Sequence, residues 1–244
     1  MKSIFGSLSI VLFFSTSLFS QDFVIEDDGL NDSLRKTIAI IPFQNNYYRS
    51  EIDRSLAASE HLDFQSLRDV QRKELDKQLY LILNDEYNVL SFLKDKNEDD
   101  QELLDYIFYS TASSYTNLES DEKVDRSILG LGQIKEAPIS EDQRYMKTVI
   151  HHPPLMATLA EQLPADLYLF IGELDILLPK DFEEKDKNRY IYMHFTLYNN
   201  AGEIVDSGII SQVIPQKKCK KIKDISMDGF APIAYQLKNR LDSL

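Results

Sequence analysis

A basic run near the C-terminus is the densest group of side chains that could do chemistry. It consists of four lysines around the only cysteine of the chain, namely Lys217, Lys218, Cys219, Lys220 and Lys221. Ammonium groups favour the thiolate form of a neighbouring thiol, so the run could make the cysteine reactive. It could also contact an anionic surface or an acidic partner. A solvated loop is the interpretation we favour, and these five residues are the candidate partner-binding residues.

Glycine and histidine patterns elsewhere lack the spacing that a site needs. Residues 130–132 read Gly-Leu-Gly, but a dinucleotide loop would have a glycine where Lys135 stands. His151 and His152 adjoin two prolines and have no helix-spaced metal partner, which favours an exposed pair. His194 lies within an alternating strand pattern and is expected to be structural.

A calcium-loop spacing near residue 95 is also incomplete. Asp95, Asn97 and Asp99 have the right separations. However, Asp100 stands where the loop needs glycine, and Tyr106 where it needs its final glutamate. A helix capped by Asn97 explains the pattern better. The sequence therefore predicts no catalytic, cofactor-binding or metal-binding residue.

The pattern of apolar residues predicts the secondary-structure elements that would carry a functional site. Residues 37–43 form an apolar run, typical of a buried strand. Residues 64–83 have helical periodicity. Two alternatives stay open: a short strand over 62–67 with Asp69 capping a later helix, and a strand that begins at Leu79 and turns into residues 87–93.

The middle of the chain is less regular. Residues 112–148 are mixed and polar, and we expect a long loop or excursion there. A short helix is predicted through Gln162, with Pro153 or Pro154 in its first turn. Residues 165–178 then predict a long strand, followed by a charged turn at 181–188.

The C-terminal part predicts an antiparallel hairpin and a final helix. Residues 190–198 alternate, with apolar side chains on one face at Ile191, Met193, Phe195 and Leu197. Residues 199–202 form a turn, the strand returns over 203–213 with a bulge expected at Gly208, and Pro232 starts the last helix. The pattern predicts that Phe195→Asp destabilises the domain, whereas His194→Ala costs little.

The fold class that follows is α/β, a mixed sheet with a C-terminal antiparallel hairpin and flanking helices. Residues 37–244 are expected to form a single domain containing the excursion. The formal charge of −13 makes the chain acidic and nucleic acid an improbable partner. A single cysteine excludes a disulfide within the chain.

The N-terminus has the order of a secretory signal: a positive charge at Lys2, an apolar stretch and then small residues. We expect residues 1–20 to be a cleaved signal peptide, with Ser20–Gln21 as the scissile bond and Ser17–Leu18 as the rival. Residues 21–36 are an acidic, flexible lead-in. The mature protein is then periplasmic or secreted, with no transmembrane anchor.

Three segments carry a family resemblance: a strand ending in Pro-Phe at 38–43, an Ala-Asp strand ending in glycine at 165–172, and the hairpin at 190–211. Together they resemble the amino-terminal domain of TolB and its relatives CsgG and LpoB, which are bacterial envelope proteins. The resemblance implies the fold and an expectation of protein binding in the cell envelope. It supplies no catalytic residue and no cofactor.

Two functions follow as hypotheses. The first is a non-enzymatic envelope protein that binds another protein, and the second is an exported hydrolase whose catalytic residues are scattered along the chain. A deep pocket with converging titratable groups would favour the hydrolase. An exposed sheet edge or apolar patch without such a pocket would favour binding. The sequence does not indicate the partner's identity or the oligomeric state.

Overall fold

The computed structural model describes residues 35–94, 98–117, 144–180 and 187–244. Its strands are β1 (Thr37–Ile41), β2 (Tyr48–Ser50), β3 (Asn88–Ser91), β4 (Thr111–Asn117), β5 (Arg144–Ile150), β6 (Leu167–Leu177), β7 (Asn188–Asn199) and β8 (Ile204–Pro215). Its α-helices are α1 (Asp53–Glu60), α2 (Phe64–Leu83), α3 (Glu98–Ser110), α4 (Leu155–Gln162), α6 (Ile222–Ile225) and α7 (Ala231–Leu241). Short helical turns lie at η2 (Asn45–Tyr47), η5 (Gln216–Lys218) and η6 (Ser226–Phe230).

Some sequence predictions fall outside these residues. They are the signal peptide at 1–20, nearly all of the lead-in at 21–36, the cap at Asn97, the Gly-Leu-Gly at 130–132 and most of the charged turn at 181–188. Among the described residues, every helix is too short or too polar to span a lipid bilayer.

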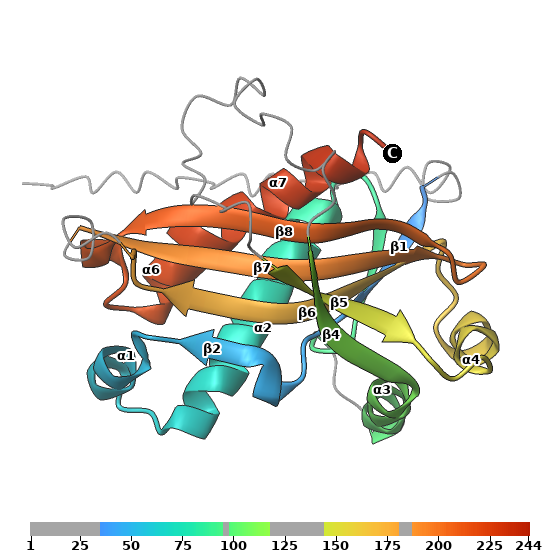
Figure 1. The fold of residues 1–244 in the computed structure, drawn as a ribbon, viewed down its shortest axis with the longest axis horizontal. Helices are drawn as coiled ribbons and strands as arrows, with labels where there is room; N and C mark the ends of the chain where they lie inside the picture. The colour runs from blue at the N-terminus through green and yellow to red at the C-terminus, as the bar shows by residue number, and fades with distance from the viewer. Residues whose placement is uncertain (1–34, 95–97, 118–143, 181–186) are drawn as a thin grey trace, which may run out of the picture. The chain divides into compact units, whose positions relative to one another are not determined.

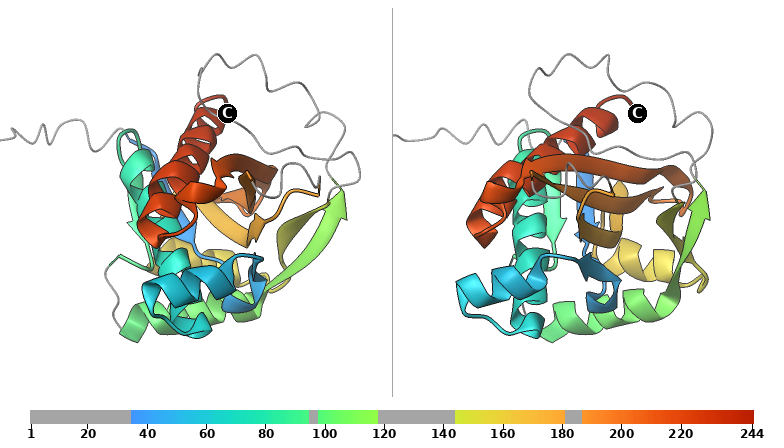
Figure 2. Two further views of the ribbon diagram at one scale, coloured as in Figure 1. Left: turned by 90° about the vertical axis from the view of Figure 1, so that its left-hand side faces the viewer. Right: turned by 60° about the vertical axis from the view of Figure 1, so that its left-hand side comes forward.

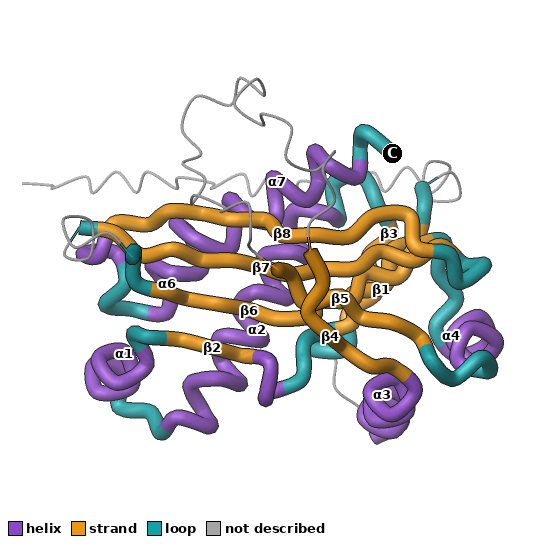
Figure 3. Tube along the Cα trace, viewed as in Figure 1, coloured by secondary structure: helices purple, strands orange, loops and turns teal. Residues whose placement is uncertain are grey.

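A mixed six-stranded sheet forms the centre of the fold (Figures 1 and 3). Its order is β3-β1-β6-β7-β8, and β2 pairs with the C-terminal half of β6. Strand β6 is parallel to β1 and β2 but antiparallel to β7, which in turn is antiparallel to β8. This arrangement confirms the predicted α/β fold class, including the C-terminal hairpin and the final helix.

One face of the sheet is covered by α2 and α7 and is here called the helix-covered face. The alternating residues of β7 all point to this face, where they join side chains of α2, α7 and β6 in the largest apolar cluster. Each such buried side chain contributes roughly 1.5–3 kcal/mol. Helix α2 runs unbroken from Phe64 to Leu83, and the Asp63 carboxylate caps its start by accepting a hydrogen bond from the backbone N–H of Ser66 at 2.8 Å. The alternative strand at 62–67, with Asp69 as the cap, is therefore wrong.

The opposite face carries a two-stranded antiparallel ribbon, β4–β5, here called the ribbon. Figure 2 shows α2 and α7 on one side of the sheet and the ribbon on the other. The expected loop at 112–148 is thus corrected at both of its ends, since residues 111–117 and 144–150 are strands. Helices α3 and α4 pack beside the ribbon against β1 and β6.

A bulge in β6 lets the ribbon approach the sheet. The pairing of β6 with β7 shifts between Ile171 and Glu173. A Cβ atom at Gly172 would lie 2.6 Å from the backbone oxygen of Met146 in β5, so only glycine fits there without movement. The extra residue keeps the apolar side chains before and after it on the helix-covered face, and it places Glu173 and Asp175 on the ribbon-covered face.

The hairpin differs in one detail from its prediction. Gly208 pairs regularly with Phe195, and the irregularity lies instead between Leu197 and Tyr198, opposite Val205. The expected bulge at Gly208 is therefore wrong. Its position could not be read from glycine alone, because any residue can occupy the extra place in many bulges.

Candidate functional site

The ribbon is seated on the sheet by hydrogen bonds to side chains of β7. Three alternate backbone N–H groups of β5 donate to three alternate side chains of β7: Met146 to His194 Nδ1 at 2.9 Å, Thr148 to Thr196 Oγ1 at 3.0 Å, and Ile150 to the Tyr198 hydroxyl at 3.4 Å. The Tyr198 hydroxyl also donates to the Thr148 carbonyl at 2.9 Å. Side chains thereby satisfy a strand edge that would otherwise lack partners.

The His194 end of this ladder adjoins two carboxylates from β6. Nδ1 lies 3.8 Å from Glu173 Oε2, and Nε2 lies 3.6 Å from Asp175 Oδ2. All three residues are at most 5% exposed. Because Nδ1 accepts the N–H of Met146, it carries a lone pair, and the ring proton of the neutral imidazole is on Nε2. That Nε2–H faces Asp175 without a hydrogen-bond partner at normal distance.

Each carboxylate has a further partner from a distant part of the chain. Arg49 of β2 binds Asp175 through two nitrogens, at 3.1 and 2.7 Å. The Tyr115 hydroxyl of β4 lies 2.8 Å from both oxygens of Glu173. Arg49 is more than half exposed, which weakens its ion pair through solvent screening. The cluster is thus closed from outside by one side chain of β2 and one of the ribbon.

Burial has a clear electrostatic consequence in this cluster. It raises the pKa of Glu173, and the neighbouring Asp175 charge raises it further. The pKa of Tyr115 is also raised, first by burial and then by its hydrogen bond to Glu173. With His194 neutral, two carboxylates face a single cation, Arg49. A proton on Glu173 would remove this charge imbalance.

Glu173, Asp175 and His194 are of the types that bind metal ions, and their ligand atoms lie within 4.8 Å of one another. Their arrangement does not fit a metal ion. A histidine that binds metal through one nitrogen normally donates the N–H of its other nitrogen. Here the other nitrogen accepts an N–H, so Nε2 keeps its proton and has no lone pair to offer. We therefore assign the cluster no metal.

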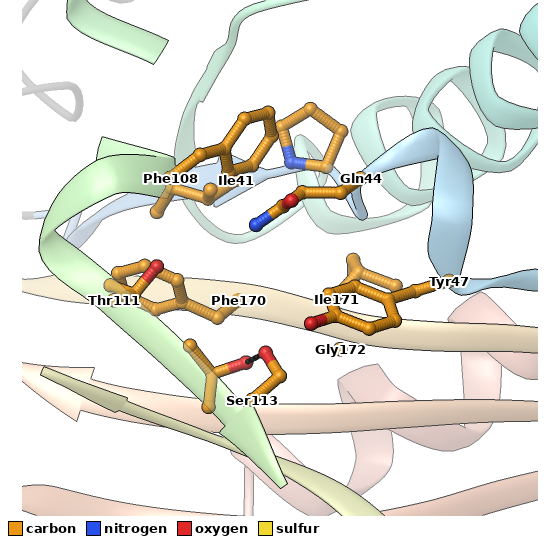
Figure 4. Close-up of a pocket in the computed structure, with 11 residues that line it drawn as sticks. Ile41, Gln44, Tyr47, Phe108, Thr111, Ser113, Phe170, Ile171 and Gly172 are labelled. Atoms are coloured by element: carbon orange, nitrogen blue, oxygen red, sulfur yellow. Dashed lines mark hydrogen bonds between the residues drawn. The ribbon is translucent and has the colours of Figure 1, made fainter. Parts of the chain in front are cut away.

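A small hollow is lined in part by Gly172, the residue before Glu173 of the cluster (Figure 4). Its floor is β6 at Phe170–Gly172, and Ser113 and Gln44 stand on opposite sides of it. The Ser113 and Thr148 hydroxyls are 3.3 Å apart within it. The cavity has a volume of about 10 Å³, room for roughly one water molecule. Substrate pockets are typically about 300–1,000 Å³, so this hollow is not one.

The candidate residues predicted from the sequence lie elsewhere, between β8 and α6. Lys217, Lys220 and Lys221 are exposed, while Lys218 pairs with Asp228 at 3.2 Å. Cys219 is buried, and its thiol contacts the Pro215 carbonyl at 3.6 Å. Burial raises the pKa of the thiol to about 12, so the reactive-cysteine interpretation fails.

Sequence patterns did not single out Glu173, Asp175, Arg49 or Tyr115. One signal was present, because Glu173 and Asp175 are two acidic residues in an otherwise apolar predicted strand. Acidic residues are almost never buried without a partner, so their position called for one. The partners themselves come from 126 and 58 residues away in the chain.

Comparisons with known proteins do not assign a family. No protein-family model matches the chain, and no curated protein matches it. A solved structure described as the Evf virulence factor matches the chain at 9% sequence identity. The match covers 84% of this chain and 85% of the chain in that structure. Its TM-score is 0.22, too low to indicate a shared fold. The resemblance to the TolB amino-terminal domain stays a prediction.

Proposed function

We propose that this is a non-enzymatic protein of the bacterial cell envelope that binds another protein through the outer edge of β4. The observation that carries the proposal is the unpaired backbone of that edge. The N–H groups of Met146 and Thr148 point away from β4, towards β7. Their register partners, Tyr115 and Ser113, therefore direct their own backbone groups outward. Within the described residues, no hydrogen bond reaches these outward groups.

An unpaired edge of this kind suits an extended polypeptide. A strand that is added to an edge gains main-chain hydrogen bonds at every second residue. The far edge of the main sheet is protected in contrast, because α7 lies along β8. There Gln236 donates to the Ser211 carbonyl at 2.9 Å and Arg240 donates to the Ser207 carbonyl at 3.3 Å. The partner segment is thus expected at β4 and not at β8.

The alternative function, an exported hydrolase, finds little support in the described residues. Titratable groups do converge at Glu173, Asp175 and His194. However, they are packed under Arg49 and Tyr115, and the adjacent cavity of about 10 Å³ cannot admit a substrate. Binding is therefore the function that the geometry supports better.

The compartment and a second contact are part of the proposal. The signal-like N-terminus and the resemblance to envelope proteins support a periplasmic or secreted location. The exposed lysines of the basic run are the second candidate contact, since they offer positive charge on a chain of net charge −13. They would favour an acidic region of the same partner.

A pair of variants at one position tests the proposal. Ser113→Pro removes an outward N–H, which an edge strand tolerates, whereas Ser113→Ala removes only the hydroxyl. Tagged wild type and both variants are used to capture proteins from envelope extracts, followed by mass spectrometry. We expect a partner that wild type and Ser113→Ala retain and Ser113→Pro loses by about tenfold or more. Equal capture by all three, with Ser113→Pro folded by circular dichroism, would overturn the edge as the binding surface.

A further inference from the structure

The three hydrogen bonds that seat the ribbon are not chemically equivalent. Two of them end on hydroxyl groups, at Thr196 and Tyr198, which stay neutral at physiological pH. The third ends on the Nδ1 atom of His194 at 2.9 Å. Histidine is the side chain that ordinarily changes its charge between about pH 5 and 8. One rung of the ladder can therefore be switched by a proton.

The location of the ring proton decides what protonation does. In the seated ribbon the proton is on Nε2, so a second proton must go to Nδ1. Nδ1 then becomes a donor that faces another donor, the N–H of Met146. The hydrogen bond is lost, and the two hydrogens repel each other at the same distance. We infer that protonation of His194 releases the His194 end of the ribbon from the main sheet, making the ribbon a pH-sensitive latch.

The surroundings supply a destination for the added proton. Glu173 Oε2 is 3.8 Å from Nδ1 and Asp175 Oδ2 is 3.6 Å from Nε2, so both N–H groups of an imidazolium would have a carboxylate to approach. The other charged or titratable groups of the cluster are Arg49 on Asp175 and Tyr115 on Glu173. From β8, the residue paired with His194 is the apolar Ile209.

Release would move the strand that carries the proposed binding edge. Strand β4 contacts the sheet through its pairing with β5 and through the hydrogen bond of Tyr115 to Glu173. Tyr115 contacts Glu173, which protonation of His194 would draw towards the ring. Loss of the His194 rung therefore loosens the ribbon where both strands meet the cluster. The inference concerns the ribbon alone and stands whether or not β4 binds a partner.

Hydrogen exchange of backbone amides, followed by NMR on the full mature chain, measures the latch directly. The amides of Met146 and Thr148 are compared at about pH 7.5 and about pH 5, after correction for intrinsic exchange rates. In wild type we expect protection of Met146 to fall by about tenfold at the lower pH. Asparagine places an oxygen near the position of Nδ1 and does not titrate. In His194→Asn the Met146 amide should therefore stay protected from exchange at both pH values.

Thr196→Val is the matched control, because it removes a neighbouring rung that cannot titrate. It should lower the protection of Thr148 equally at both pH values. The inference is overturned if wild-type protection of Met146 is independent of pH. It is also overturned if His194→Asn loses protection on acidification as wild type does, since Glu173 and not His194 would then be the switch. A ring proton on Nδ1 at neutral pH, seen in ¹⁵N spectra of the histidine, would contradict its basis.

Discussion

The two faces of β6 and β7 belong to the same strands but are stabilised by different interactions. The helix-covered face is an aliphatic and aromatic layer in which β7 alone contributes four fully buried side chains. The ribbon-covered face buries Glu173, Asp175, His194 and Thr196, and it is joined by directed hydrogen bonds. Both faces exclude water. The first does so mainly by apolar packing, whereas the second combines these polar contacts with a smaller apolar cluster beneath α3 and α4.

Stability and positional specificity reside on different faces of these strands. Apolar burial is non-directional and adds up over many contacts. A hydrogen bond contributes a net of only about 0.5–1.5 kcal/mol, but a buried polar group left without its partner costs more. The helix-covered face should therefore dominate the free energy of unfolding, and the ribbon-covered face should set the position of the ribbon.

The largest effect is expected on the helix-covered face. Phe195 is fully buried there, and the guanidinium of Arg240 lies 5.1 Å from its ring centre. Phe195→Ala should lower the free energy of unfolding by about 3–5 kcal/mol, through lost burial and a cavity. Urea unfolding measures this, with Tyr109→Ala as the control because Tyr109 is 74% exposed. Equal losses in the two variants would mean that Phe195 is not in the core.

The carboxyl group of Asp76, buried on the helix-covered side, should change the free energy of unfolding by about 3 kcal/mol as the pH changes. Each unit of difference between its folded and unfolded pKa values corresponds to about 1.4 kcal/mol. Burial raises the pKa of Asp76 from 3.8 to about 6. The folded state thus binds this proton more tightly than the unfolded state, and the ionised group costs stability above about pH 6. The stability of the fold therefore gains from this group as the pH falls from about 6 to 4.

The Asp76→Asn variant isolates that gain. Its amide keeps an acceptor for the Ser91 hydroxyl, which donates to Asp76 at 2.5 Å. At neutral pH the variant should be more stable than wild type, and the difference should vanish towards about pH 4. Urea unfolding at several pH values checks this. A constant difference between the two proteins would show that Asp76 does not titrate as stated.

An intermediate effect is expected for His194. The sequence pattern predicted that His194→Ala would cost little, because His194 lies on the face of β7 opposite the four apolar side chains. The structure shows that this opposite face is buried as well, because the ribbon covers the His194 side chain and leaves it 2% exposed. The variant should lower the free energy of unfolding at neutral pH by about 1–3 kcal/mol, as the Met146 N–H loses its acceptor. A thermal melt indistinguishable from that of wild type would restore the original prediction.

The smallest effect on stability is expected in the basic run. Lys217 and Lys221 are exposed, so the double variant Lys217→Glu, Lys221→Glu should change the free energy of unfolding by less than about 0.5 kcal/mol. If the run contacts an acidic partner, the same variant should weaken capture of that partner, most clearly at low salt. Unchanged capture at low salt would remove these two lysines from the interface.

Much of the fold could be predicted because it depends on local periodicity. The alternation at 190–198, the apolar run at 37–43 and the proline at the start of α7 each indicated its element correctly. The ribbon could not be predicted in this way. Strand β4 reads Thr-Ala-Ser-Ser-Tyr-Thr-Asn, which has little apolar alternation because it buries no full apolar face. Its strand character comes from pairing with β5.

The α/β class, the helix-covered core and the absence of an internal disulfide could be read from the amino-acid sequence, since they depend on composition and on periods of two and 3.6 residues. The burial of β7 on both faces and the burial of the Cys219 thiol follow only from the folded arrangement of the chain. That arrangement also brought Arg49, Tyr115 and His194 to the two carboxylates of β6. A buried polar group requires a partner, but its residue type does not specify where in the chain that partner lies. The partners are brought to the carboxylates by the bulge at Gly172 and by the close approach of the ribbon there. Both arise from contacts between distant segments of the chain.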